Sequence, residues 1–247
     1  MMTKLAKMIT ISTFLLIKSL DAEVTQTCLL SITEANKKAI SYVGNTNPVN
    51  GRMQLELLLR EGLQKDNYVL DLGCGALVAG IPIMSFLDQE HYVGIDPNKW
   101  LIDVSLHIKK NMDITLCKRP LFLYNGDFDA RSTNITFDYI ISHSIISHAA
   151  YWQLDLFLLM CSKVLKKGGK VIFSLRLTEP NEFGNEGALE ETNSNKWVYP
   201  DNSFFHKETI IRKAAPLFNI IEHKKLYTEL IMTTDKSAKH DWFVLTK

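Results

Sequence analysis

Short apolar runs and helical patterns alternate along most of this chain. The apolar runs predict strands at residues 68–72, 91–95, 121–124, 137–141 and 170–175, and the helical patterns between them lie at 77–87, 100–110 and 151–167. Near-continuous apolar strands that alternate with helices are typical of a parallel sheet covered on both faces. The alternation therefore predicts an α/β fold and argues against an all-helical or an all-β one.

The last part of the chain extends this pattern. A helix is predicted at 206–217, followed by strands at 218–226 and 242–246. No regular pattern separates these two strands, so they can pair antiparallel. The predicted fold is a seven-stranded sheet, mostly parallel with a terminal antiparallel hairpin, and helices on both faces. Residues 50–247 form this domain, with a polar, glutamate-rich insertion at about 177–205 that we interpret as a lid.

Residues 1–49 are predicted to form an N-terminal helical extension. Ser31 and Glu34 form a capping box, which predicts a helix that continues to about Tyr42. Residues 1–22 resemble a signal peptide, because lysines precede an apolar stretch at 8–17. The alternative is a retained helix that packs on the domain. We expect a cytoplasmic protein, with the secretory pathway as the alternative if residues 1–22 are cleaved. The stretch is too short to span a bilayer, and no other segment predicts a transmembrane helix.

Composition limits the classes of function. The 247 residues include 28 Lys and Arg against 27 Asp and Glu, a net charge of +1. Nucleic-acid binders usually carry a basic excess, so nucleic acid is an unexpected partner. The four cysteines are far apart in sequence, which predicts reduced thiols and no zinc motif. No cluster of acidic residues indicates a metal site, and the sequence specifies no oligomeric state.

A glycine-rich turn follows the first predicted strand. Residues 69–80 read VLDLGCGALVAG, so Gly73 and Gly75 lie where the strand ends. In open α/β sheets, ligands bind beyond the carboxyl ends of the strands, and glycine lets a ligand approach the backbone closely. The dinucleotide fingerprint G-x-G-x-x-G fails because its third glycine position is Val78. A different nucleotide-like cofactor is therefore expected at this turn.

The turn resembles the first motif of the class I S-adenosylmethionine-dependent methyltransferases, D-x-G-C-G, at residues 71–75. Leu77 stands where that family usually has a third glycine. The resemblance continues in order through 94–97 (GIDP), 126–128 (GDF), 137–142 (FDYIIS) with the trailing His148, and 164–169 (VLKKGG). It covers about residues 50–247 and implies a Rossmann-like fold with S-adenosyl-L-methionine as the cofactor.

The resemblance also implies roles for individual residues. Asp96, followed by Pro97, would accept hydrogen bonds from the ribose hydroxyls, or would only cap a helix. Asp127 would contact the adenine amine while Phe128 covers the ring. Asp71 would bind the methionine amine through water, or would only fix the turn. The cofactor-binding residues expected from the resemblance are Asp71, Gly73, Cys74, Gly75, Asp96, Pro97, Asp127, Phe128 and Ser142.

Catalysis is less specified than cofactor binding. His148 and His143 are the candidate general bases, although a structural role is the alternative for each. Methyl transfer from a sulfonium is a direct displacement, so alignment of the reactants matters most and no metal is needed. We expect a small-molecule methyl acceptor, bound between the region before Gly51 and the lid. The alternatives are a protein or RNA methyltransferase, or a cofactor-binding interaction domain without catalysis.

Overall fold

The computed structural model describes residues 38–39, 42, 48–178, 203–225, 227 and 240–247. The chain divides into two units, Met1–Asn45 and Thr46–Lys247. In the first unit, the described residues Lys38, Ala39 and Tyr42 have helical backbone. The signal-like segment, the capping box and most of the predicted lid lie outside the described residues.

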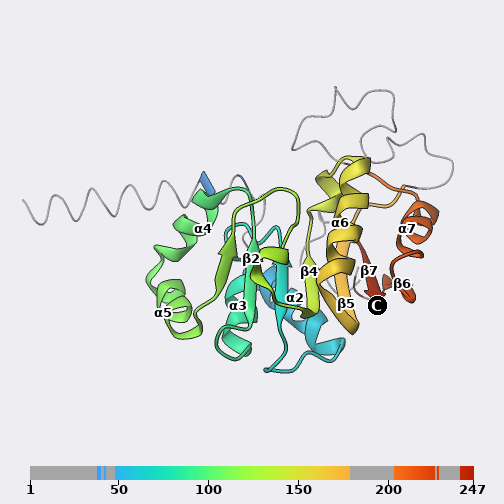
Figure 1. Cartoon of the computed structure of the whole chain (residues 1–247). Coiled ribbons are helices and arrows are strands. Elements are labelled where there is room, and N and C mark those ends of the chain that lie inside the picture. Colours follow the sequence, from blue (N-terminus) through green and yellow to red (C-terminus); the bar gives the residue numbers. More distant parts are fainter. Residues whose placement is uncertain (1–37, 40–41, 43–47, 179–202, 226, 228–239) are drawn as a thin grey trace, which may run out of the picture. The chain divides into compact units, whose positions relative to one another are not determined.

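The second unit contains the predicted sheet (Figure 1). Its strands are β1 (Val69–Leu72), β2 (Tyr92–Ile95), β3 (Leu121–Leu123), β4 (Phe137–Ser142), β5 (Leu165–Leu175), β6 (Ile220–His223) and β7 (Asp241–Thr246). Their order in the sheet is β3-β2-β1-β4-β5-β7-β6. Strands β1 to β5 are parallel, and β7 is antiparallel to both β5 and β6. The predicted α/β fold, including its terminal antiparallel hairpin, is confirmed.

Helices cover both faces of this sheet. They are α2 (Pro48–Arg60), α3 (Gly80–Phe86), α4 (Lys99–Leu106), α5 (Lys109–Lys118), α6 (Tyr151–Val164) and α7 (Lys207–Ala214), with short 3-10 helices η1 (Arg131–Thr133) and η2 (Ile146–His148). Apolar residues of α6 and α7 belong to one buried cluster, and those of α2, α3 and α4 belong to the other. The helices therefore form one layer on each side of the strands.

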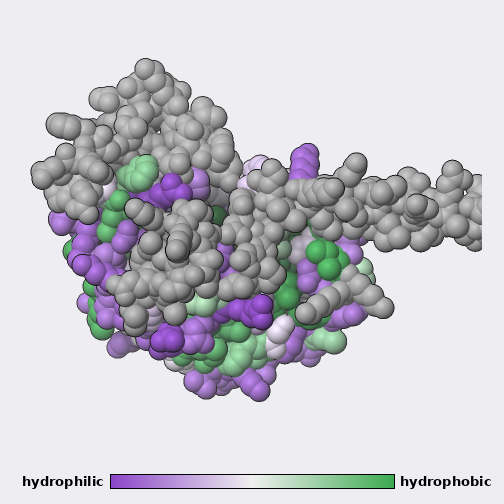
Figure 2. Space-filling view, turned by 180° about the vertical axis from the view of Figure 1, so that it is seen from behind, coloured by the Kyte–Doolittle hydropathy of each residue, from purple (hydrophilic) through white to green (hydrophobic). Residues whose placement is uncertain are grey.

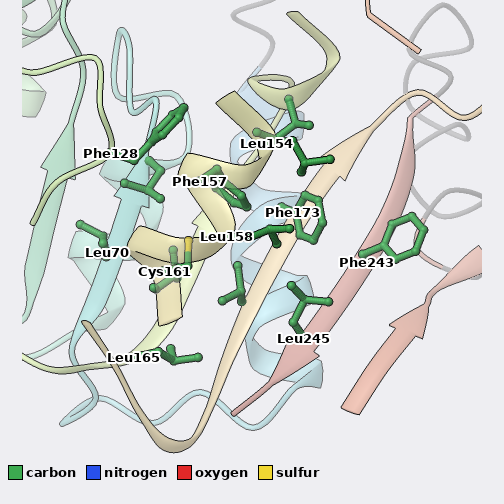
Figure 3. Packing of buried hydrophobic residues seen from close by; sticks show 14 of the residues in the cluster. Leu70, Phe128, Leu154, Phe157, Leu158, Cys161, Leu165, Phe173, Phe243 and Leu245 are labelled. Atoms are coloured by element: carbon green, nitrogen blue, oxygen red, sulfur yellow. The ribbon is translucent and has the colours of Figure 1, made fainter. Parts of the chain in front are cut away.

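Strand β1 shows how the two apolar clusters are separated. Leu70 and Leu72 belong to the cluster beneath α6, whereas Val69 belongs to the cluster on the opposite face, because side chains alternate along a strand. Figure 3 shows Phe157, Leu158 and Cys161 of α6 pointing toward the strands. Full burial of a Leu or Phe side chain contributes about 1.5–3 kcal/mol, so this face supplies much of the stability.

The order of the strands reverses beside β1. Strand β2 lies on one side of β1 and β4 on the other, and the chain runs outward in both directions from there. The connections after β1 and β4 therefore leave the sheet on opposite faces, and it is at such a point that open α/β sheets have a ligand-binding crevice, beyond the carboxyl ends of the strands. The glycine turn after β1 lies at this point.

One predicted helix is wrong in its extent. The pattern at 100–110 predicted a single helix, but the chain forms α4 and then α5, with a break at His107 and Ile108. The side chain of Asn111 donates to the Ser105 carbonyl (3.1 Å) and stabilises this break. The apolar residues of α5 include Leu116, which is 71% exposed, so the helix lacks the buried stripe from which sequence patterns are identified.

The start of β5 also differs from the prediction. The helix predicted to reach Lys167 ends at Val164, and the strand begins at Leu165 rather than Lys170. Leu165 pairs with Phe137 of β4, and the register then shifts before Lys170 pairs with Tyr139. Gly168 adopts a φ of +77°, which suits this irregular pairing. Tertiary pairing with β4 therefore extends the strand through a sequence that resembles a turn.

The two ends of the predicted lid lie together near the carboxyl end of β5. Leu177 forms a parallel bridge with Phe205, and the Phe205 amide donates to the Arg176 carbonyl (2.9 Å). The Ser203 amide donates to the Ser147 carbonyl in η2 (2.7 Å). Residues on both sides of 179–202 are thus fixed near the crevice.

The described surface is mixed in character. On the face shown in Figure 2, hydrophilic residues predominate and hydrophobic ones form small separate groups. A mixed surface of this kind is ordinary for a folded protein. Among the helices that the structure describes, none is both long and apolar enough to cross a membrane.

Candidate active site

The turn after β1 is fastened to the end of β2. The backbone amides of Gly73 and Cys74 both donate to the Ile95 carbonyl, at 2.8 and 3.0 Å. Gly73 has a φ of +79°, and a Cβ there would lie 2.2 Å from the side chain of Ile145. Both facts require glycine at this position. The Cys74 side chain is buried, and burial raises the pKa of its thiol well above the ordinary value.

Asp96 joins the turn to the end of β2 through its side chain. Its carboxylate accepts hydrogen bonds from the Gly75 amide (3.0 Å) and the Asn98 amide (2.7 Å). Burial raises the pKa of Asp96, although these two hydrogen bonds oppose the effect. A carboxylate has about four acceptor positions, so each oxygen can accept a further hydrogen bond. Asp96 can therefore bind a pair of hydroxyl groups while it holds the turn.

Asp71 points into the protein rather than into solvent. Only 3% of the residue is exposed, and its carboxylate accepts a hydrogen bond from the Tyr92 hydroxyl at 2.7 Å. Burial raises the pKa of Asp71 to about 7, and the nearby Asp96 adds to this effect. Of the two roles considered for Asp71, fixing the turn is the one that these contacts favour.

The loops after β2 and β3 meet at the same edge. Pro97 is exposed, and its Cβ lies 3.9 Å from the position that a Cβ of Gly126 would occupy. Asp127 is exposed beside them. Phe128 has a φ of +61° and packs its ring edge-on against Phe157, with centroids 5.6 Å apart. Asp127 is therefore open to solvent at this edge, whereas Phe128 lies mainly in the core.

Strand β4 closes the other side of the crevice. The Ser142 hydroxyl donates to the Leu72 carbonyl (3.0 Å), which ties the ends of β1 and β4 together. Ile145 then packs over Gly73. Ser142 is fully buried, so it supports the turn from beneath.

His143 lies in a group of polar and aromatic side chains at the ends of β4 and β7. Its Nδ1 lies 3.3 Å from the side-chain nitrogen of Gln54 in α2. The imidazole stacks on Trp242 at 5.2 Å and meets His240 edge-on at 5.3 Å. The ring of His143 is thus held in one orientation by residues from two other elements.

His240 and His148 extend this polar group. The Nε2 atom of His240 lies 3.2 Å from the hydroxyls of both Ser144 and Ser147. His148 ends η2 and is half-buried. Because Ser203 bonds to Ser147, the end of the predicted lid reaches the segment that carries His148. Both candidate histidines therefore lie on the β4 side of the crevice.

Several residues in this arrangement belong to no recognisable sequence motif. Tyr92 falls within the strand predicted at 91–95, and no motif includes His240, Gln54 or Trp242. Each contacts a site residue more than 20 positions away, so no local spacing could reveal it. Within the part of the chain that the structure describes, no three His, Cys, Asp or Glu side chains lie together as a metal site requires.

Comparison with known proteins agrees with this geometry. Residues 70–171 match the family model of a methyltransferase domain. An uncharacterized protein of Rickettsia prowazekii is 26% identical over 190 residues, which is 72% of this chain and 33% of that protein. The chain thus spans about one third of the length of this curated relative.

Solved structures with low sequence identity share the fold. Human N-acetylserotonin methyltransferase, solved with S-adenosylmethionine, aligns with a TM-score of 0.53 at 16% identity, over 81% of this chain and 52% of that one. A Haemonchus contortus phosphoethanolamine N-methyltransferase gives 0.56 at 18% identity, over 79% and 52%. Magnesium protoporphyrin IX methyltransferase from Synechocystis gives 0.54 at 13%, over 80% and 84%. Residues 70–171 thus match a methyltransferase domain, and the fold of the chain is that of these S-adenosylmethionine-dependent methyltransferases.

Proposed function

We propose that this chain transfers a methyl group from S-adenosylmethionine to a small-molecule acceptor. The observation that carries the proposal is the Asp96 carboxylate, bonded to the Gly75 amide at the point where the strand order reverses. An acceptor of hydroxyl hydrogen bonds beside a glycine turn suits an adenosine ribose. The same turn fails the dinucleotide fingerprint at Val78, which favours this cofactor over NAD.

The charge of the site suits a cationic ligand. Asp71 and Asp96 are both buried beside the turn, and burial raises the pKa of each. Among the described residues, no Lys or Arg lowers either pKa. A sulfonium cation bound nearby would stabilise the ionised form of both groups. This balance supports S-adenosylmethionine, whose sulfonium carries the activated methyl group and makes it open to direct displacement.

The remaining cofactor contacts follow from the loops at this edge. Exposure of Asp127, in the loop that meets Pro97, supports a contact with the adenine amine. Phe128 is 8% exposed, so it would offer the adenine only a ring edge. Gly73, Cys74 and Gly75 would present backbone to the methionine part of the cofactor. Ser142 would act indirectly, through its bond to the Leu72 carbonyl.

The β4 side of the crevice would bind the acceptor. His143 is oriented by Gln54 and Trp242, and it would accept the proton of a hydroxyl or amine acceptor during transfer. His148 is the second candidate base, because its segment is tied to the lid end through Ser147 and Ser203. The chain would align the acceptor atom in line with the methyl group and exclude water. The proposed transfer uses no metal.

A small acceptor in the cytoplasm fits the composition. The balanced charge, 28 basic against 27 acidic residues, gives little attraction for the phosphates of RNA. A lid would enclose a small molecule more readily than a protein surface.

The reaction also needs a supply of S-adenosylmethionine, which favours a cytoplasmic location with residues 1–22 retained. Intact-mass analysis of protein from its native source tests this, since cleavage would give a chain that starts near Glu23.

A thermal melting experiment tests the cofactor. S-adenosylmethionine and S-adenosylhomocysteine should each raise the melting temperature, by a stabilisation of about 2.7 kcal/mol at a hundredfold excess over Kd. NAD should leave the melting temperature unchanged. A shift with NAD and none with S-adenosylmethionine would overturn the proposal.

Transfer of a labelled methyl group tests the reaction. Cofactor with a radioactive methyl group is incubated with a panel of small phenols, carboxylic acids, amines and thiols, and separately with protein and RNA. Label in a small molecule, lost in His143→Gln or His148→Gln while cofactor still binds, is the expected result. Label only in protein or RNA would contradict the small-molecule assignment.

A further inference from the structure

Tyr92 makes a contact that the proposed reaction does not use. It begins β2, pairs in register with Val69 and is almost fully buried. Its hydroxyl donates to the Asp71 carboxylate at 2.7 Å. Among the described residues, it is the Tyr92 hydroxyl that donates to this carboxylate. A buried carboxylate without a donor is costly, so this hydroxyl matters for the state of Asp71.

The same hydroxyl also reaches the far end of the turn. A Cβ on Gly80 would lie 2.5 Å from the Tyr92 oxygen. Gly80 is the first residue of α3, so the hydroxyl lies between the end of β1 and the beginning of α3. The segment between these two points, residues 73–79, contains the whole glycine turn. Tyr92 therefore contacts both ends of the segment that faces the cofactor.

We infer that Tyr92 is a positioning residue for the cofactor: its hydroxyl holds Asp71 and the start of α3, and thereby fixes the turn in which the Gly75 amide meets Asp96. This inference rests on the proposed function, because it concerns the same cofactor site. Tyr92 itself is buried beneath the turn and acts through Asp71 and the backbone rather than on the cofactor.

The groups that face Asp71 determine how this contact responds to pH. They are Tyr92 from β2, Cys74 from the turn and Asp96 after β2. Helix α3 has the sequence GIPIMSF and contributes no titratable side chain. Burial raises the pKa of both the Tyr92 phenol and the Cys74 thiol well above their ordinary values, so both stay neutral. The Tyr92 hydrogen bond therefore acts against burial and the Asp96 charge to favour the Asp71 carboxylate.

This arrangement predicts that cofactor binding depends on pH. Ionised Asp71 favours a cation nearby, so affinity for S-adenosylmethionine should rise as the pH passes through about 7, where Asp71 ionises. Loss of the Tyr92 hydroxyl raises the pKa of Asp71 further, which moves this rise to higher pH. S-adenosylhomocysteine lacks the sulfonium charge, so its affinity should change less with pH.

Calorimetric titration of full-length protein with both ligands between pH 6 and 8.5 tests the inference. Tyr92→Phe should bind S-adenosylmethionine about tenfold more weakly than wild type at pH 7, the loss expected from one hydrogen bond to a charged group. Tyr139→Phe is the matched control. The Tyr139 hydroxyl is also held in the interior, where it donates to the Glu61 carbonyl (3.0 Å), but it lies away from the turn. Its removal should change affinity less than about twofold, with an unchanged pH profile.

The outcomes separate this inference from the proposed function. The inference is supported if the wild type binds S-adenosylmethionine and the rise of affinity with pH moves to higher pH in Tyr92→Phe but not in Tyr139→Phe. If Tyr92→Phe binds S-adenosylmethionine with the same affinity as the wild type at every pH, the inference is overturned and the proposed function is left intact. Absence of binding by the wild type overturns both together. If Tyr92→Phe does not fold, Asp71→Asn answers the same question, because the rise in affinity for S-adenosylmethionine near pH 7 should then be absent.

Discussion

Two buried carboxyl groups lie near opposite edges of the same sheet and differ in their neighbours. Glu61, just after α2 near the amino edge, accepts a hydrogen bond from Lys170 (2.8 Å) and another from the Tyr227 hydroxyl, and Lys224 lies 3.5 Å away. Asp71, at the carboxyl edge, has one hydroxyl donor and a second carboxylate nearby. Among the described residues, two lysines lie beside Glu61, whereas no cation is recorded beside Asp71.

The pKa values shift in opposite directions as a result. Burial alone would raise the pKa of Glu61, but the hydrogen bonds from Lys170 and Tyr227 and the charges of both lysines together lower it. Burial raises the pKa of Asp71 to about 7, and Asp96 adds to the rise. A buried charge that the fold compensates stabilises the fold, whereas one that it leaves uncompensated is available to a charged ligand.

The largest expected difference between the two groups is in the pH dependence of stability. The Asp71 pKa is 3.8 when unfolded and about 7 when folded. The contribution of Asp71 to the free energy of unfolding is fully present below the unfolded pKa. It is lost as the pH rises through 7, a loss of about 4 kcal/mol. Asp71→Asn removes this titration. In urea titrations without cofactor, the wild type should lose about 4 kcal/mol relative to Asp71→Asn between pH 4 and pH 8.

Glu61→Gln gives the opposite sign and serves as the control. The folded pKa of Glu61 is lowered, so its contribution is present above the unfolded pKa and is lost as the pH falls through the folded value. The wild type should thus exceed Glu61→Gln in stability at pH 7, and this advantage should fade in acid. If the free energy of unfolding differed by a constant amount between the wild type and Asp71→Asn from pH 4 to pH 8, the contrast between Asp71 and Glu61 would be contradicted.

Two glycines extend the comparison to the backbone. Gly73 in the turn and Gly168 in β5 have φ values of +79° and +77°. A Cβ on Gly73 would clash with Ile145 at 2.2 Å, whereas a Cβ on Gly168 would have no atom within 4 Å. Gly168→Ala should cost about 1 kcal/mol, from backbone strain alone. Gly73→Ala should cost about 3 kcal/mol by thermal unfolding and abolish cofactor binding. Equal costs would show that the turn is no more crowded than the strand.

Removal of one of the lysines beside Glu61 should have a smaller effect on stability. Lys170→Met leaves Glu61 with weaker compensation and should cost about 2 kcal/mol by urea unfolding. Lys170 is 29% exposed and Glu61 is 7% exposed, so solvent screens part of the interaction. The control is Lys99→Met, whose partner Asp103 is also exposed, and it should leave the urea unfolding midpoint nearly unchanged. Cofactor affinity should not change in either variant, and a loss in Lys170→Met would contradict a purely structural cluster.

The sequence predicted the parts of the fold that local pattern determines. Strands with near-continuous apolar sequence, such as those predicted at 68–72 and 137–141, were correctly placed, because burial on both faces of the sheet requires such a run. Helix α5 was missed because its apolar residues Met112 and Leu116 remain exposed and leave no stripe. The start of β5 was missed because pairing of Leu165 with Phe137 overrides a turn-like sequence.

The site was predictable only where its residues form local motifs. Gly73, Gly75 and Asp96 were singled out from short motifs, and the structure brings them together. Tyr92, His240 and Lys170 were not, because each acts through a partner that only the tertiary fold brings near. Phe128 follows an expected motif, yet its positive φ directs the ring toward Phe157 in the core. A motif thus identifies a position in the chain but not the direction of its side chain.

A crystal structure with S-adenosylhomocysteine tests the central claim most directly, namely that the turn held by Asp71 and Asp96 at the carboxyl edge forms the cofactor site. The ribose hydroxyls should donate to the Asp96 carboxylate while its bond to the Gly75 amide is kept, and Asp71 should remain on Tyr92 beneath the turn. Binding of the ligand at any other place, or at this edge without contact to Asp96, would contradict the account.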